Sequence, residues 1–235
     1  MQHPFRLKRS ARAKNARIVV TADGVDVIVP LKTPAKWVQL WVDAKQGWID
    51  AQITKLKARA ASITPLAPAH YTEGALIPYA GRHYPLTLHS TPRKRCRVEF
   101  NDGFTVFVPA TNVTPVQQHA VVQAALQQWL KAAVKAQVQL LIAQHAPKQQ
   151  LWPQTIRIKQ QKTRWGSCGG NNDININWLL ILAPPPILEY VLVHELCHIR
   201  EKNHSARFWA LVAEHLPDYQ QRRNWLKQHG ASLKM

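Results

Sequence analysis

The segment from residue 187 to residue 204 constrains this chain more than any other part of its sequence. His194 and His198 lie four residues apart, so a helix places them one above the other on the same face. Glu195 follows the first histidine, and apolar residues flank all three on every side, so we expect a buried helix. The plain alternative is a pair of hydrogen-bonded core histidines with Glu195 in a salt bridge. A divalent cation held by the two imidazoles explains the buried polar groups better.

A third protein ligand is expected, because catalytic zinc sites usually combine three protein ligands with one water. His204 lies six residues after His198 and is the first candidate; His215 and Glu214 are the alternatives. The helix has to end between His198 and His204. We expect Asn203 to adopt the left-handed conformation that a sharp exit needs.

The first half of the chain is expected to be rich in β-structure. Residues 18–20 and 25–29 are β-branched runs around the turn dipeptide Asp23-Gly24, which predicts a hairpin. Residues 34–61 have a helical apolar spacing, and the proline-rich residues 62–80 are expected to form a connection. Further strands are predicted at residues 84–88, 96–100 and 104–108, with a turn at 101–103. Together they predict a small antiparallel sheet with one helix.

The second half is expected to place helices around short strands. Thr114 and Pro115 are typical of a helix start, and this long helix is expected to end before Pro147. Strands are predicted at residues 155–159 and 173–177, and helices at 187–200, 205–216 and 217–229. The chain is therefore predicted to be an α+β protein. Residues 1–112 would form a β-rich region, and residues 113–235 a catalytic region whose histidine helix packs on a small sheet.

Charge and cysteine content limit the partners and the compartment. The formal net charge is +18, and the basic residues are densest between Arg6 and Arg17. Such a surface favours anionic partners, including nucleic acid bound without sequence preference. Three cysteines in a chain of this length do not suggest a disulfide framework, so a reducing compartment such as the cytoplasm is expected. Neither a membrane-spanning run nor a secretion signal is expected.

Several short motifs accompany the histidines. They are Arg164-Trp165-Gly166-Ser167-Cys168, Asn177-Trp178, Leu182-Ala183-Pro184, Tyr190-Val191, Asn203-His204-Ser205 and Phe208-Trp209. With them the chain resembles the YgjP-like family of metal-dependent hydrolases, which are of the zincin class and related to SprT-like peptidases. The resemblance implies a zincin-like catalytic half. It also implies that His194, His198 and His204 bind Zn²⁺ and that Glu195 is the general base. The substrate it implies is either a peptide or a nucleotide with a phosphoanhydride bond.

Residues 164–168 are expected on a loop that follows a strand. Arg164, Trp165 and Ser167 could line a pocket beside the zinc. An equally good interpretation is a structural turn, in which Gly166 adopts unusual backbone angles and Trp165 lies in the core.

A cationic or hydroxyl donor is also needed to stabilise the negative charge of a hydrolytic transition state. Arg164, His215 and Tyr219 are the candidates that the sequence offers, and the sequence does not rank them.

Three hypotheses about function remain at this point. The first is a metallopeptidase in which Glu195 activates a zinc-bound water. The second is a nucleoside triphosphate pyrophosphohydrolase, which the basic charge permits. The third is a nucleic-acid binding module with a structural metal; Glu195 argues against it, because a structural site needs no base.

Overall fold

The computed structural model describes residues 3–21, 23–61, 63–110 and 114–235, and the chain divides into two compact units, Met1–Thr64 and Pro65–Met235. The boundary expected between residues 112 and 113 lies outside the described residues. The elements on either side of it, β7 (Phe104–Pro109) and α3 (Pro115–Gln149), both belong to the second unit and pack on each other. Within the described residues, no helix is both long enough and apolar enough to cross a membrane.

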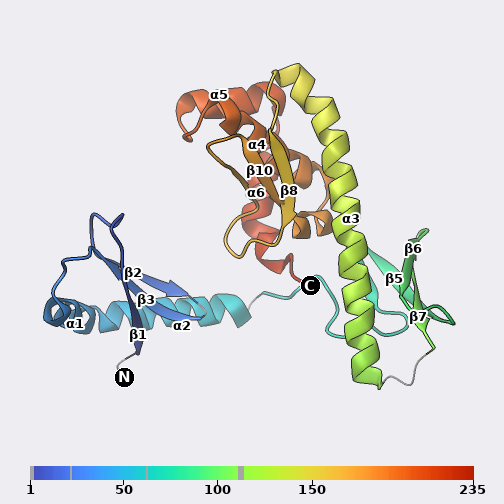
Figure 1. The fold of residues 1–235 in the computed structure, drawn as a ribbon, viewed down its shortest axis with the longest axis horizontal. Helices are drawn as coiled ribbons and strands as arrows, with labels where there is room; N and C mark the ends of the chain where they lie inside the picture. The colour runs from blue at the N-terminus through green and yellow to red at the C-terminus, as the bar shows by residue number, and fades with distance from the viewer. Residues whose placement is uncertain (1–2, 22, 62, 111–113) are drawn as a thin grey trace. The chain divides into compact units, whose positions relative to one another are not determined.

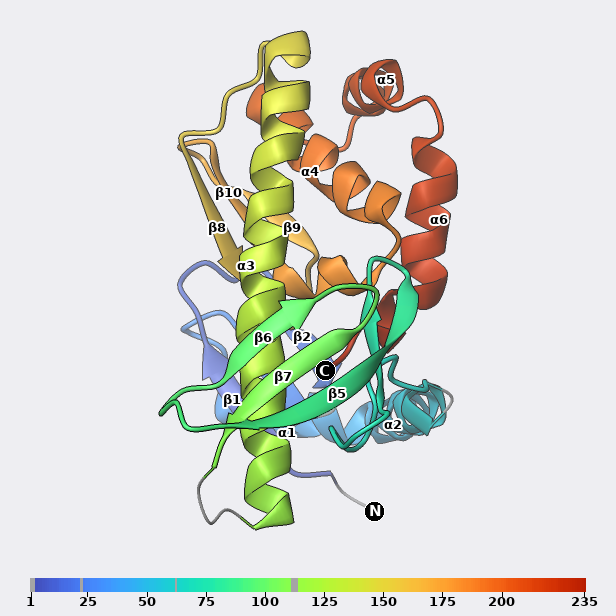
Figure 2. The same cartoon turned by 90° about the vertical axis from the view of Figure 1, so that its right-hand side faces the viewer.

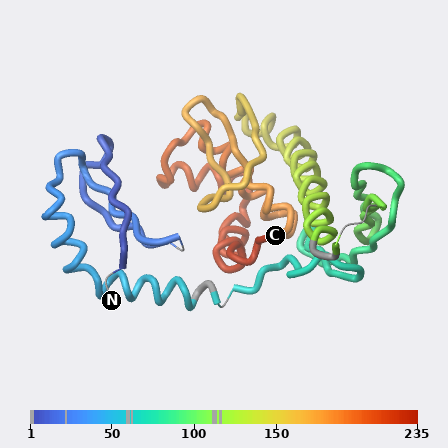
Figure 3. The backbone as a smooth tube through the Cα atoms, turned by 60° about the horizontal axis from the view of Figure 1, so that its bottom comes forward, coloured from blue at the N-terminus to red at the C-terminus, as the bar shows by residue number. Residues whose placement is uncertain are grey.

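The N-terminal unit combines a small sheet with helices. Its elements are β1 (Phe5–Arg9), β2 (Arg17–Thr21), β3 (Gly24–Val29), α1 (Ala35–Ala44) and α2 (Gln46–Ala61). β2 and β3 pair antiparallel, which confirms the predicted hairpin, whereas β1 was not predicted and pairs parallel to β3. One helix was predicted over residues 34–61. The chain instead turns at Lys45, which ends α1 with a φ of −103° (Figure 3).

The second unit begins with a sheet in the strand order β4-β5-β7-β6. Its first three strands are β4 (Leu76–Tyr79), β5 (Arg82–Thr91) and β6 (Arg97–Phe100). The prediction of a purely antiparallel sheet was wrong, because β5 and β7 pair in parallel. β7 lies between β5 and β6 in the sheet. The segment after β5 therefore passes over the place of one strand to reach β6, and β7 then fills that place by pairing antiparallel with β6 through a tight hairpin.

β4 and β5 are joined by the turn Ala80-Gly81, where residues 62–80 were expected to be a plain connection. Both turn residues have positive φ, 50° and 79°, as a two-residue hairpin turn requires. The N–H of Ala80 donates to the Ile181 carbonyl at 2.8 Å, and that of Gly81 to the Leu182 carbonyl at 3.2 Å. A Cβ on Gly81 would lie 2.9 Å from the Cα of Pro184, so this close approach needs glycine.

α3 runs through the second unit as its longest helix. Figures 1 and 2 show the strands β5, β6 and β7 beside its first half and β8, β10 and α4 beside its second half. The predicted cap is confirmed, since Thr114 and Gln117 form a reciprocal capping box. The predicted end was wrong: the helix continues to Gln149 with Pro147 in its last turn. It ends at Gln150, whose φ of 52° is left-handed.

A second sheet follows, in the order β8-β10-β9, and then a group of helices. These elements are β8 (Thr155–Lys159), β9 (Gly166–Cys168), β10 (Asp173–Asn177), α4 (Pro185–Arg200), α5 (Ala206–His215) and α6 (Tyr219–His229), with short 3-10 helices at Trp178–Leu182 and Gly230–Ser232. α4 contacts α3, β9, β10, α5 and α6, so it is the central element of this unit. The mixed content of helices and sheets agrees with the predicted α+β class.

A partly buried polar network fastens one face of α4 to its neighbours. The Glu189 carboxylate is 2.8 Å from Nε2 of His145 on α3 and accepts a hydrogen bond from Arg222 on α6 at 2.5 Å. Arg222 also donates to Asp218 at 2.8 Å. Burial raises the pKa of Glu189, but the hydrogen bonds from Arg222 and His145 outweigh it and leave the pKa below its usual value.

Candidate metal centre

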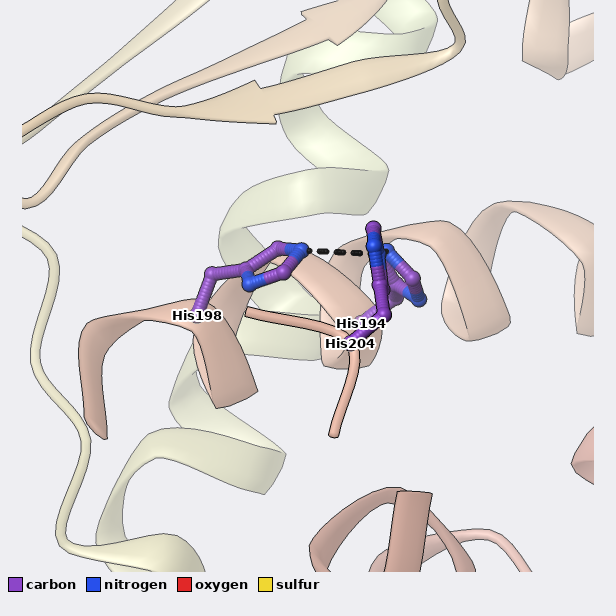
Figure 4. Close-up of side chains that lie close together, drawn as sticks. All are labelled: His194, His198 and His204. Carbon is purple, nitrogen blue, oxygen red and sulfur yellow. Dashed lines mark hydrogen bonds between the residues drawn. The ribbon is translucent and has the colours of Figure 1, made fainter. Parts of the chain in front are cut away.

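Three histidine rings converge beside α4 (Figure 4). His194 and His198 lie one turn apart on α4, half-buried, with ring centroids 4.9 Å apart. His204 lies on the exposed connection between α4 and α5. Its Nε2 atom is 3.0 Å from Nε2 of His194 and 3.1 Å from Nε2 of His198. The structure thus brings together the three residues that the spacing singled out.

The ring of Phe208 on α5 packs against all three histidine rings. Its ring centroid lies 4.8 Å from that of His194, 4.4 Å from that of His198 and 4.9 Å from that of His204, and its side chain is fully buried. Ser205 holds this helix start in place, because its hydroxyl accepts a hydrogen bond from the N–H of Phe208 at 3.4 Å.

The exit of the chain from α4 differs from the prediction. Asn203 is not left-handed: the described non-glycine residues with positive φ are Ala80, Asp102, Gln150 and Asn172. The helix ends instead at Glu201, in an extended conformation with a φ of −111°. A few residues of extended chain are enough to return His204 to the helix.

The hydrogen-bond pattern of the imidazoles fits a metal. Nδ1 of His198 lies 2.9 Å from the Glu201 carbonyl oxygen, which can only accept, so this nitrogen carries the proton. Nε2 of His198 is then left with a lone pair that points at His194 and His204. An imidazole oriented in this way by a backbone carbonyl is typical of a zinc ligand. The three ligand nitrogens lie within 4.8 Å of one another, and a cation between them satisfies all three.

His194 is held in the neutral form that a ligand needs. Burial lowers its pKa to about 3, helped by the nearby His198, His204 and Arg223. Its Nδ1 atom is buried and has no hydrogen-bond partner in the part of the chain that the structure describes. Proton binding at this ring is therefore costly at neutral pH, while metal binding through Nε2 is not.

Glu195 lies next to the histidines in an apolar environment. The residue is 5% exposed, and burial raises the pKa of its carboxyl to about 8. The charge of Arg164 and a hydrogen bond from the backbone N–H of Cys168 act against this rise. A carboxylate with a pKa near neutrality is well suited to take up and release a proton.

Gly166 has a steric role that the sequence did not reveal. It belongs to strand β9 rather than to a loop, and it is not among the described glycines with positive φ, so the predicted unusual backbone angles were wrong. A Cβ at this position would lie 2.6 Å from Oε1 of Glu195. The absence of a side chain at Gly166 is what leaves room for the carboxylate.

The neighbours of Gly166 in its motif have different surroundings. Side chains alternate along a strand, so Ser167 faces away from Glu195, and its hydroxyl accepts a hydrogen bond from Asn175 at 3.2 Å. Trp165 is half-buried and packs against the main core near Gly230. Arg164 is exposed, and its charge reaches Glu195.

The helices α5 and α6 supply an aromatic wall beside His204. The Trp209 ring is stacked 5.6 Å from that of His204 and 5.4 Å from that of Tyr219, both at about 20° or less. The guanidinium of Arg223 lies 4.5 Å above the Trp209 ring. Tyr219 was a candidate from the sequence, whereas Arg223 was not. Their spacing of four residues on one helix was the available signal.

His215 lies apart from this group. The charged residues that act on it are Glu214, His145 and Arg200, and burial lowers its pKa. None of the three converging histidines is among them, and neither His215 nor Glu214 belongs to the histidine group found among the described residues.

Comparison with known proteins identifies the family to which the chain belongs. The sequence profile described as YgjP-like, metallopeptidase domain matches residues 14–229. The chain belongs to this family. This confirms the resemblance drawn from the motifs, and with it a metallopeptidase-type, metal-dependent hydrolase.

Individual relatives match shorter parts of the chain. A UTP pyrophosphatase of Escherichia coli (strain K12) is 32% identical over 71 residues, which cover 28% of this chain and 42% of that protein. The match thus spans less than half of the relative. The crystal structure of the metallopeptidase zymogen of Pyrococcus abyssi abylysin shares 20% identity and covers 38% of this chain and 93% of its own, with a TM-score of 0.35.

Proposed function

We propose that the protein is a zinc-dependent hydrolase that cleaves peptide bonds. The observation that carries this proposal is the convergence of three Nε2 atoms, within 3.1 Å from one to the next, beside the buried carboxylate of Glu195. His194, His198 and His204 would hold the metal. Zinc is the metal whose catalytic sites most often use three protein ligands and keep one position for water.

Zinc, when bound, acts as a Lewis acid and lowers the pKa of water to about 7. The residues of the chain do the rest. Glu195 takes a proton from the attacking water at its carboxylate and passes it to the leaving nitrogen. Gly166 leaves room for that carboxylate, and the apolar surroundings keep its pKa close to the working pH. Arg164 is exposed near Glu195 and can stabilise negative charge that develops on the substrate.

The peptide substrate is favoured by the position of β9. This strand lies at the edge of its sheet and is packed against α4, where Gly166 touches Glu195. A peptide in the extended conformation can add to such an edge through backbone hydrogen bonds. The description of the family as a metallopeptidase domain agrees with this choice.

A second candidate is the hydrolysis of nucleoside triphosphates. The Escherichia coli relative named UTP pyrophosphatase favours it. A nucleic-acid binding module with a structural metal is the weakest of the three hypotheses, because a buried carboxylate beside the histidines serves no structural site.

One panel of substrates separates these functions. Zinc-loaded protein is offered casein, the four common nucleoside triphosphates and labelled DNA, each with and without a chelator, and Glu195→Gln is run in parallel. We expect cleavage of casein that the chelator and the variant both abolish. Pyrophosphate release from triphosphates, without proteolysis, would replace the first proposal by the second. DNA binding without any hydrolysis would replace both.

We also propose that the basic N-terminal unit recruits an anionic partner such as nucleic acid. Arg6 and Lys8 are engaged with Asp26 at 2.7 Å, so they are poor sites for a test. Arg12 and Lys14 are exposed and form no ion pair with any described residue. Replacing both with glutamate should weaken retention on DNA at low salt. If the wild-type protein does not bind DNA at low salt, the recruitment proposal is wrong.

The compartment that we propose is a reducing one such as the cytoplasm. Cys96, Cys168 and Cys197 are all unpaired, which supports this proposal.

A further inference from the structure

Two adjacent arginines on α6 are used in different ways. Arg222 is held by Glu189 and Asp218 and so fastens α6 to α4. Arg223 is exposed and has no carboxylate partner in the described part of the chain. Its guanidinium lies over the face of the Trp209 ring, 4.5 Å from the ring centroid. The first arginine is accounted for by the fold, and the second is not.

The aromatic wall fixes where the second guanidinium lies. Trp209 is stacked beside His204, and its ring centroid is 5.7 Å from that of His194, so Arg223 is one ring removed from the metal centre. Its positive charge also acts on His194 and on the buried Tyr190. A planar guanidinium that rests on an indole is oriented as well as charged.

Arg164 occupies a comparable position on the β9 side. It is exposed, its charge acts on Glu195, and it too has no carboxylate partner among the described residues. Cations placed beside a metal site raise the free energy of that site when a metal cation is bound there. An anion that binds beside either arginine offsets this repulsion, so the arrangement favours a ligand with negative charge.

We propose that Arg223, oriented by Trp209, forms a subsite for an anionic group that the substrate carries next to the bond that is cleaved. The group is a carboxylate or a phosphate, because both match the fork of donors on a guanidinium. This inference rests on the proposed hydrolase function and deepens it. Arg223 would determine specificity and would take no part in proton transfer.

The binding test uses the zinc-loaded Glu195→Gln protein, so that no ligand is consumed. Calorimetry compares two matched pairs of ligands. The first is an alanine-rich hexapeptide with one glutamate against the same peptide with glutamine, both with an acetylated N-terminus and an amidated C-terminus. The second is uridine 5′-monophosphate against uridine. We expect Arg223→Ala to weaken the anionic member of one pair by at least about tenfold and to leave its neutral counterpart unchanged. Arg223→Lys keeps the charge without the fork and should recover only part of the loss.

Lys227 provides the control. It is exposed on α6 one turn beyond Arg223 and is not among the charges that act on His194. Lys227→Ala removes the same charge from the same helix and should change neither pair. In the active protein, Arg223→Ala should raise KM for the anionic substrate with little change in kcat.

The outcomes separate the subsite from the hydrolase proposal. A loss of affinity for the glutamate peptide identifies a carboxylate as the ligand, and a loss of affinity for uridine monophosphate identifies a phosphate. Equal weakening of charged and neutral ligands, or the same loss in Lys227→Ala, overturns the subsite. If the wild-type protein hydrolyses nothing in the panel while anion binding still depends on Arg223, the subsite stands and the hydrolase proposal fails.

Discussion

The two faces of α4 carry glutamates whose pKa values are shifted in opposite directions. On one face, Glu189 is hydrogen-bonded by His145 and Arg222, and its pKa is lowered. On the other, Glu195 is buried with a pKa raised to about 8, and Nδ1 of His194 has no partner among the described residues. The same helix therefore carries a paired network on one face. On the other it carries a carboxylate whose charge burial disfavours and a ring nitrogen without a hydrogen-bond partner among the described residues.

This difference in hydrogen bonding distinguishes groups that stabilise the fold from groups that can bind a ligand. A buried polar group that is fully paired stabilises the packing of neighbouring elements. A buried group left without partners costs free energy, and such groups cluster at functional sites. Changes on the Glu189 face should therefore cost stability, and changes on the Glu195 face should cost activity.

The largest effect is expected when a ligand is removed. His198→Ala leaves two of the three converging imidazoles, so zinc should no longer be retained and hydrolysis should fall by roughly a thousandfold or more. Elemental analysis after zinc loading and dialysis measures the first effect, with about one zinc per chain expected for the wild type. A wild-type protein that retains no zinc would contradict the metal assignment.

Glu195→Gln tests the base without touching the ligands. Glutamine has the same shape but cannot accept the proton, so activity should fall by roughly a hundredfold or more while zinc content stays unchanged. Full activity of this variant against the cleaved substrate would disprove the proposed role of Glu195.

The same variant should stabilise the metal-free protein at high pH. Because the pKa of Glu195 rises from 4.5 to about 8 on folding, its ionisation costs stability progressively as the pH increases through this window. Below pH 4.5 the carboxyl is neutral in both states and the cost is absent. Urea unfolding of zinc-free protein at pH 8.5 should show Glu195→Gln more stable than wild type by roughly 2 to 4 kcal/mol, with the difference vanishing toward pH 4. If the difference in stability between the variant and the wild type did not depend on pH, the raised pKa of Glu195 would be contradicted.

On the opposite face, Arg222→Ala should act on stability alone. It leaves the carboxylate of Glu189 partly buried without its main donor, so the free energy of unfolding should fall by about 1 to 3 kcal/mol. The activity of the folded protein should be unchanged. Arg207→Ala is the matched control, because Arg207 is 85% exposed and its ion pair with Glu201 spans 3.8 Å. That variant should stay within about 0.5 kcal/mol of wild type.

The smallest effect is expected at Gly166. Gly166→Ala places a methyl group where the Glu195 carboxylate lies, so the carboxylate has to shift and activity should fall by about tenfold with zinc retained. Gly170→Ala is the control, because a Cβ there meets nothing within 4 Å. If both variants behave alike, steric control of Glu195 by β9 is refuted.

Local patterns predicted the part of the site that lies within one stretch of chain. His194 and His198 share a helix face by their spacing, and a short exit loop is enough to return His204 to them. Long-range approaches were not predictable in this way. The contact between Gly166 and Glu195 depends on how β9 packs against α4, and nothing in either local sequence reports it. Arg223 was missed because its approach to the site depends on how α6 packs beside Trp209 of α5.

The fold was predictable to a similar degree. Strands bounded by turn dipeptides, such as the hairpin around Asp23-Gly24, were found because their signals are local. The parallel pairing of β5 with β7 was not, because strand order depends on which distant edges meet. β4 was missed for the same reason: its proline-rich sequence becomes a strand only when β5 pairs with it.

The turn between β4 and β5 also bears on how the chain assembles. Ala80 and Gly81 bond the carbonyls of Ile181 and Leu182, immediately before the helix that carries the histidines. During synthesis the hairpin leaves the ribosome long before its acceptors do, and closing so long a loop is slow. The first residues of the histidine helix therefore gain their anchor late. A fragment that begins at residue 113 would lack that anchor altogether, so truncation there should yield a catalytic helix with a frayed start.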